Sequence, residues 1–178
     1  MNELFENIPV NISELPDVAK SEYHGIEKAY LTVARISNSI LFSVLIIGAF
    51  CIIFFNDDIN NIPLNYAISI GPLMLFWILS LLFVSKAFPK KKYSLREKDI
   101  IYTKGLLWNT RTSIPFNRIQ HAEVKQGPID RMFKLHSLKV FTAGGDSSDL
   151  VIPGLSEEKA NKIKEFIMGK TALDDSGS

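Results

Sequence analysis

The sequence predicts an α+β membrane protein: a two-helix transmembrane hairpin, then an antiparallel β-sandwich or open barrel capped by a C-terminal α-helix. Two observations predict this order, namely two uncharged apolar runs and the short alternating segments that follow them. The runs span Ile36–Phe55 and Leu64–Val84, each close to the ~20 residues that cross a bilayer as a helix. A buried hairpin in a soluble protein is the alternative, but a chain this small has too few other residues to cover two such helices.

Basic residues flank the pair of apolar runs and are absent from the turn between them. They are Lys28 and Arg35 before the first run, and Lys86, Lys90, Lys91 and Lys92 after the second. The turn contains Asp57 and Asp58 instead. Because basic residues favour the cytoplasmic side, we expect a multi-pass protein with both termini in the cytoplasm. No short apolar stretch with a cleavage site precedes the first run, so we expect that run to be both signal and anchor.

The patterns divide the chain into four segments. Apolar residues before the first run recur at three- or four-residue spacing, which predicts an amphipathic helix within a cytoplasmic N-terminal segment, residues 1–35. This helix either docks at the lipid interface or on the domain, or is a plain lead-in to the membrane helix. The transmembrane hairpin takes residues 36–85, the folded domain residues 90–170, and a disordered tail residues 171–178.

Short alternating segments separated by turn residues predict antiparallel strands in the folded domain. The expected strands are Tyr93–Arg96, Ile100–Lys104, Thr110–Ile114, Ile119–Gln126, Leu138–Ala143 and Leu150–Ile152, with one helical turn near Ile129–Leu135. We expect Pro153 and Gly154 to stop the last strand. Ser156 is a good N-cap for an amphipathic helix that Gly169 closes. Such a helix can cover the open edge or end of a curved sheet.

Four motifs in this region stand in a characteristic order. They are Ile114-Pro115-Phe116-Asn117-Arg118-Ile119-Gln120, Gln126-Gly127-Pro128-Ile129-Asp130-Arg131-Met132-Phe133, Leu138-Lys139-Val140-Phe141-Thr142-Ala143-Gly144 and Ile152-Pro153-Gly154-Leu155. Together they resemble the second type of bacterial pleckstrin-homology-like (PH-like) domain, formerly a domain of unknown function, which two membrane helices often precede, as in YdbS-like membrane proteins. The resemblance implies a PH-like fold. Lys134 departs from the family, which often has Gly there, so the turn must avoid positive φ or accept its cost.

The resemblance also implies a function and a location. It suggests a non-enzymatic scaffold for protein–protein assembly in the bacterial inner membrane, with a partner membrane protein that carries PH-like domains; a homo-oligomer is also open. The candidate partner-binding residues are Arg118, Gln120, Gln126, Arg131 and Phe133, around strand edges where strand addition could occur. The competing interpretation is structural: Arg118 and Gln120 would hydrogen-bond loop backbone.

Membrane lipids are the second class of partner. Residues 90–170 carry 16 Lys or Arg against 9 Asp or Glu. Such a basic domain is attracted to anionic head groups by ~1 kcal/mol per well-placed cation, so an anionic-lipid sensor is the alternative function. The expected membrane-surface contacts are Lys86, Lys90, Lys91 and Lys92. The charge-balanced turn Arg96–Asp99 does not suggest the phosphoinositide site of some eukaryotic PH domains. Nucleic acid is not expected as a partner, because stacking aromatics do not interleave with the basic residues.

No residue pattern indicates catalysis, a metal or a cofactor. His24, His121 and His136 have no metal-ligand spacing among themselves or with Cys51, although His121 and His136 could meet in the fold. No glycine-rich phosphate loop is found. A small transporter or channel subunit is a third possible function, and the lack of ionisable residues within the apolar runs argues against it.

Overall fold

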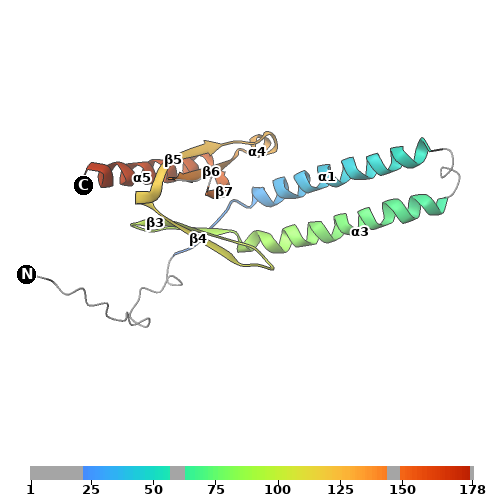
Figure 1. Ribbon diagram of the computed structural model, residues 1–178, viewed down its shortest axis with the longest axis horizontal. Coiled ribbons are helices and arrows are strands. Elements are labelled where there is room, and N and C mark those ends of the chain that lie inside the picture. The colour runs from blue at the N-terminus through green and yellow to red at the C-terminus, as the bar shows by residue number, and fades with distance from the viewer. Residues whose placement is uncertain (1–21, 57–62, 144–148, 177–178) are drawn as a thin grey trace, which may run out of the picture.

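Two long helices extend side by side from one end of a small α+β domain (Figure 1). The computed structural model describes residues 22–56, 63–143 and 149–176. The helices are α1 (Ala29–Phe54) and α3 (Pro63–Ala87), and both are long and apolar enough to cross a membrane. Most of their large hydrophobic side chains are exposed, so the described part of the chain does not bury them in a core of its own. The two predicted membrane helices are therefore present, and the buried-hairpin alternative is contradicted.

Polar side chains within the helices bond across the pair. Trp77 Nε1 donates to Ser39 Oγ at 3.3 Å, and Ser80 Oγ donates to Asn38 Oδ1 at 3.0 Å. In an apolar surrounding such groups must satisfy one another, because no water is available to them. These contacts align α1 with α3.

The domain contains two antiparallel sheets and a covering helix. The first sheet has the order β1-β2-β3-β4, formed by β1 (His24–Gly25), β2 (Lys92–Leu95), β3 (Asp99–Lys104) and β4 (Thr110–Pro115). The second has the order β5-β6-β7, formed by β5 (Ile119–Lys125), β6 (Leu135–Thr142) and β7 (Leu150–Ser156). The short helix η3 (Phe88–Lys90) connects α3 to β2, while η4 (Phe116–Arg118) and α4 (Pro128–Met132) connect strands, and α5 (Glu157–Ser176) follows β7. The predicted order of strands followed by a helix is confirmed.

The hydrophobic core lies between the two sheets and α5. Its most deeply buried members come from every layer: Ile100 from the first sheet, Leu138, Val140 and Ile152 from the second, and Ala160 and Ile167 from α5. Helix α5 contacts all three strands of the second sheet. Phe116 of η4 packs against Phe166 of α5 with ring centroids 5.8 Å apart. The helix therefore closes the opening that the strand pattern alone would leave exposed.

The predicted N-terminal helix is present from Ala29, where α1 begins and continues without a break into the first apolar run, but the prediction is wrong for residues 22–28. The segment before α1 is extended, and His24 and Gly25 pair with Tyr93 and Lys92 of β2. Ile26, only 7% exposed, joins the core. Strand pairing and core burial outweigh the weak helical periodicity here. The rest of the predicted helix, residues 17–21, lies outside the described residues. The membrane hairpin is thus inserted into the first sheet of the domain.

Two predicted ends are also wrong. Strand β7 continues through Pro153 and Gly154 to Ser156, because a register shift against β6 between His136 and Leu138 accommodates them. Helix α5 continues through Gly169 to Ser176, so the expected tail is helical over most of its length. A single glycine weakens a helix without having to end it.

Candidate functional site

Glu27, just before the first residue of α1, attaches this end of the helix to β7 and α5. Its backbone N–H donates to the carbonyl of Gly154 at 2.8 Å, and its carboxylate pairs with Lys159 Nζ at 2.6 Å. Gly154 has a φ of +67°, and a Cβ placed there would lie 2.7 Å from Cβ of Tyr30. Only glycine fits this position, because both the backbone angle and the neighbouring tyrosine exclude a side chain. The orientation of the membrane helix on the domain is thereby set.

A cavity of about 360 Å³ lies where the membrane helices meet the first sheet, and we call it the junction cavity. Helix α1 contributes Tyr30 and Ala34 to its lining, and α3 contributes Phe83 and Ala87. The loop between β3 and β4 contributes Trp108. These residues form a mainly apolar wall that continues directly into the membrane-spanning surface.

Two lysines give the junction cavity its charge. Lys91 Nζ lies 4.7 Å from the ring centroid of Tyr30, a cation–π contact, and Lys104 lines the same cavity. The pKa of the Lys91 amine is lowered, because burial disfavours its charge and because Lys104 repels it. Within the described part of the chain, neither amine has a carboxylate partner. The cavity therefore combines apolar walls with two uncompensated cations.

The β3–β4 loop, residues 105–109, is hydrophobic and lies beside the C-terminal end of α3, where this helix meets the domain (Figure 1). Leu107 is 72% exposed and Trp108 82% exposed. Gly105 has a φ of +110°, and a Cβ there would come within 1.8 Å of the Trp108 carbonyl oxygen. Gly105 thus allows the tight loop that presents Trp108. Exposed tryptophan next to a membrane helix is typical of the bilayer interface.

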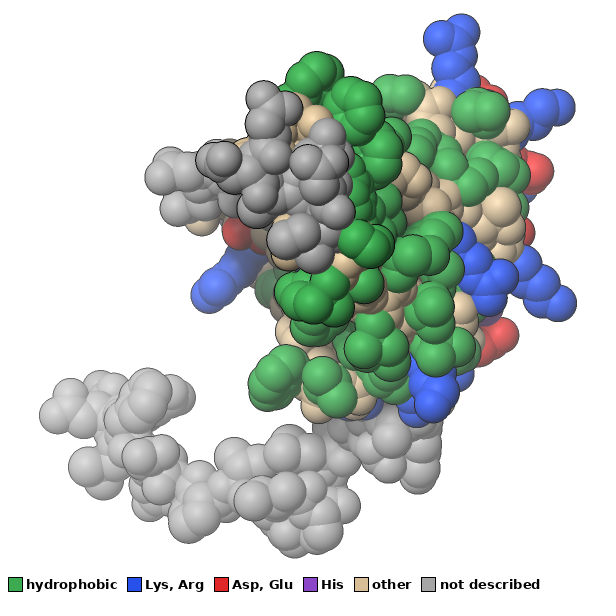
Figure 2. Space-filling model, turned by 90° about the vertical axis from the view of Figure 1, so that its right-hand side faces the viewer, with side chains coloured by type: hydrophobic (Ala, Val, Ile, Leu, Met, Phe, Trp, Pro, Cys, Tyr) green, Lys and Arg blue, Asp and Glu red, His purple; other side chains and the backbone are tan. Residues whose placement is uncertain are grey.

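The outer face of the first sheet is basic at the same end. Strand register aligns Lys92 with Thr103 and Thr103 with Arg111, and Lys90 lies nearby around a second, more polar cavity of about 440 Å³. Seen along the helices from their far end, hydrophobic side chains dominate the surface, and Lys and Arg project around the edge of the domain (Figure 2). Of the predicted membrane-surface residues, Lys86, Lys90 and Lys92 are exposed and Lys91 lines the junction cavity.

The predicted partner-binding residues flank one open strand. β5 is an edge strand that pairs with β6 alone in its sheet. Arg118 and Gln120 are exposed at its start, whereas Gln126, Arg131 and Phe133 follow its end. Gln126 Nε2 donates to the Leu135 carbonyl at 3.1 Å and so has a structural contact. Among the described residues, the Arg118 and Arg131 guanidinium groups have no ion-pair partner.

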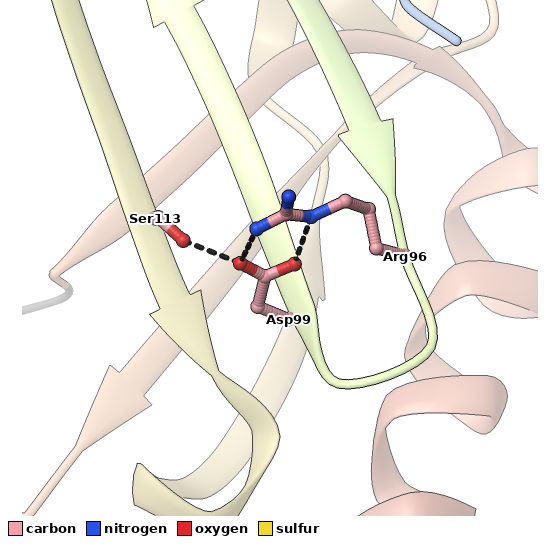
Figure 3. A network of polar contacts seen from close by, with 3 residues as sticks. All are labelled: Arg96, Asp99 and Ser113. Carbon is pink, nitrogen blue, oxygen red and sulfur yellow. Dashed lines mark hydrogen bonds and ion pairs between the residues drawn. The ribbon is translucent and has the colours of Figure 1, made fainter. Parts of the chain in front are cut away.

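An ion pair between Arg96 and Asp99 spans the turn between β2 and β3, residues 96–98. Arg96 Nε donates to Asp99 Oδ1 at 2.6 Å, a second guanidinium nitrogen contacts Oδ2, and Ser113 Oγ donates to the same Oδ2 at 2.7 Å (Figure 3). β2 begins next to α3, so this turn lies at the end of the sheet away from the membrane helices. It therefore provides no free cation facing the bilayer.

A sequence model described as "Bacterial PH domain" matches residues 32–171. The chain belongs to the bacterial PH domain family. It is 29% identical over 102 residues to the UPF0699 transmembrane protein YdbS of Bacillus subtilis (strain 168), covering 54% of this chain and 62% of YdbS. It is 26% identical over 128 residues to the UPF0699 transmembrane protein YdbT of the same strain, covering 71% of this chain and 25% of YdbT. The chain thus spans less than two thirds of either relative.

A solved structure aligns with about half of the chain. A DUF1696 family protein with a pleckstrin-homology domain from Shewanella loihica PV-4 aligns with a TM-score of 0.37 and 19% identity, covering 47% of this chain and 73% of that one. The assignment to the family rests on the sequence match. Both Bacillus relatives are named transmembrane proteins, in agreement with the two apolar helices found here.

Lys134, at the position where the resemblance implies a glycine, has an unusual backbone conformation. Lys134 adopts a φ of +53°, the left-handed region that glycine enters most easily. Its N–H donates to the Arg131 carbonyl at 3.2 Å, a hydrogen bond that closes the turn after α4. The chain accepts the strain of this backbone angle and does not avoid it.

The histidines of this PH domain are dispersed. His121 stacks on Phe141 with ring centroids 4.2 Å apart, while His136 pairs with Leu155 of β7. Residues 22–56, 63–143 and 149–176 contain no group of three or more His, Cys, Asp or Glu that could hold a metal. Domains of this family are generally non-enzymatic.

Three residues of the junction cavity were missed from the sequence. They are Tyr30, Lys104 and Trp108, and no sequence pattern brings these three residues together. Trp108 carried a usable signal, since an exposed Leu-Leu-Trp loop near a membrane helix is unusual in a soluble surface.

Proposed function

We propose that this protein is a non-enzymatic scaffold, anchored in the bacterial inner membrane with both termini cytoplasmic, whose PH domain assembles with a partner membrane protein that carries PH domains. The supporting observation is the open edge of β5, flanked by exposed residues on both sides. An edge strand offers backbone donors and acceptors that a strand of a partner can complete. Arg118 and Arg131 would then add charge-assisted contacts at the two ends.

The attachment of the domain to its anchor also supports this proposal. Pairing of β1 with β2, together with the Glu27 and Tyr30 contacts, holds the sheets in one orientation relative to the membrane helices. A domain held in this way presents its β5 edge in the same direction to any neighbour in the plane of the membrane. That restriction lowers the entropic cost of assembly compared with a domain on a loose tether.

Co-purification from the native membrane tests the proposal. The full-length protein is isolated in mild detergent, and a PH-domain membrane protein is quantified by mass spectrometry. We expect the double variant Arg118→Ala/Arg131→Ala to retain at most about a tenth of the partner. The matched control, Lys90→Ala/Lys92→Ala, removes two exposed basic residues at the outer face of the first sheet and should retain all of it. Equal loss in both variants, or no PH-domain protein with the unaltered chain, would overturn the proposal.

A further inference from the structure

We propose that the junction cavity binds one anionic phospholipid of the adjoining leaflet, with its phosphate between Lys91 and Lys104 and an acyl chain along α1 and α3. This site is separate from the β5 edge and does not depend on assembly with a partner. It also differs from a general attraction of the basic surface for lipid, because a defined cavity with two named cations recognises the head group.

The charge of the cavity requires an anion. The register that aligns Lys92 with Thr103 places Lys91 next to Lys104 on the opposite, inward-facing side of the sheet. Two like charges side by side, one of them partly buried, raise the free energy of the folded protein unless a counter-ion is present. In the described residues neither has a carboxylate to pair with. A phosphate between the amines would neutralise both.

The walls of the cavity indicate an amphiphile and not a free phosphate. Leu31 and Ala34 of α1 face Phe83, Val84 and Ala87 of α3 across it. The small alanines leave room between the helices, and the apolar surface leads directly toward the membrane-spanning region. An inorganic anion gains nothing from such walls, whereas an acyl chain of the adjoining leaflet can pack against them without entering water.

The β3–β4 loop places the cavity at the right depth. Trp108 lines it from the side opposite the helices and is otherwise exposed. Tryptophan prefers the head-group level, where its ring meets the upper acyl chain and its N–H meets water or phosphate. The lysines then lie at phosphate height, and the alanine-lined walls lie just below.

Tryptophan quenching by brominated lipids provides the test. The chain has two tryptophans, so Trp77→Phe leaves Trp108 as the reporter. Full-length protein is placed in phosphatidylcholine nanodiscs containing increasing amounts of phosphatidylglycerol with brominated chains. We expect Trp108 to be quenched at a mole fraction of phosphatidylglycerol about tenfold lower than that of brominated phosphatidylcholine giving equal quenching.

Matched variants separate the cavity from the surface. Lys91→Gln/Lys104→Gln should remove the preference for phosphatidylglycerol, and Ala34→Leu, which fills the cavity without changing charge, should remove it too. Lys90→Gln/Lys92→Gln removes the same charge from the outer face and should leave the preference intact. If the outer-face variant loses as much of the preference for phosphatidylglycerol as the cavity variant does, the lipid is attracted to the basic surface in general and the proposal fails. It also fails if millimolar glycerol phosphate displaces the lipid, because the acyl chain would then contribute nothing.

Discussion

Tyr30, in the first turn of α1, lies directly against Gly154 of β7, so a membrane helix and the second sheet of the domain share one tightly packed contact. Together with the pairing of His24 to Tyr93, this contact makes the anchor part of the PH fold. The domain is therefore not suspended below the bilayer on a linker. Its open edge and its junction cavity keep fixed positions relative to the membrane.

Gly154→Ala should separate the helix from the sheet. The added Cβ would lie 2.7 Å from Tyr30, and alanine is strained at a φ of +67°. We expect the free energy of unfolding to fall by about 1–3 kcal/mol, seen as a lower melting temperature of the full-length protein in detergent.

The control for this change is Gly169→Ala in α5, where a Cβ meets nothing within 4 Å. Alanine there should stabilise the protein by about 0.5–1 kcal/mol, because glycine is a poor helix former. If Gly154→Ala left the melting temperature unchanged, the described contact between helix and sheet would be wrong.

Lys134→Gly should stabilise the protein. Lys134 is held at a φ of +53°, which glycine adopts without the steric penalty of a side chain. We expect a gain of about 1 kcal/mol in the free energy of unfolding, measured by chemical denaturation. Lys139→Gly, in the middle of β6, is the matched control and should be destabilising instead. A loss of stability in Lys134→Gly would show that the lysine side chain has a role the contacts do not reveal.

Asp99→Asn should lower stability in a pH-dependent way. The hydrogen bond from Arg96, aided by that from Ser113, holds the pKa of Asp99 below its usual range. The pKa of Asp99 is lower in the folded than in the unfolded chain, where it is about 4. The stabilisation by Asp99 is therefore fully present above about pH 4 and is lost as the pH falls through the pKa of the folded state. We expect a deficit of about 1 kcal/mol at pH 7 for this partly exposed pair.

Thermal unfolding between pH 3 and pH 7 checks this expectation. The melting temperatures of the unaltered protein and of Asp99→Asn should converge as the pH is lowered. A constant difference in melting temperature across the range would contradict an electrostatic origin. The turn is remote from the membrane, so lipid selectivity should not change in this variant.

Gly105→Ala should disrupt the β3–β4 loop. The added Cβ would lie within 1.8 Å of the Trp108 carbonyl, so the loop must change shape at a cost of about 1–3 kcal/mol. In a Trp77→Phe background we expect the Trp108 emission in nanodiscs to shift to longer wavelength as the ring leaves the interface. Gly48→Ala, where a Cβ meets nothing within 4 Å, is the control and should leave the emission unchanged.

The sequence was most informative where a signal is local. The two apolar runs predicted α1 and α3 because length and hydropathy alone specify a membrane helix. Strands such as Thr110–Pro115 followed from alternation and turn residues. The strand at His24 could not be predicted, because its partner Tyr93 follows the whole membrane hairpin in the sequence. No local pattern indicates a pairing between such distant residues.

The site was harder to predict than the fold. The run Lys90–Lys92 reads as a uniformly basic surface, yet the pleat of β2 puts Lys92 on the outer face and leaves Lys91 facing the cavity. Lys104 meets Lys91 only through the register of two strands. The flanks of β5 could be proposed from motifs, but only the strand order shows that β5 is an edge.

Site-specific photo-crosslinking from the edge of β5 tests the scaffold function most directly. A photoreactive amino acid replaces Gln120 in the full-length protein within its native membrane, and Lys92 on the outer face of the first sheet serves as the control position. The scaffold function predicts an abundant crosslink from position 120 to a membrane protein that carries PH domains, and little from position 92. Crosslinks from position 120 to lipid alone, or equal yields of the same product from both positions, would contradict it.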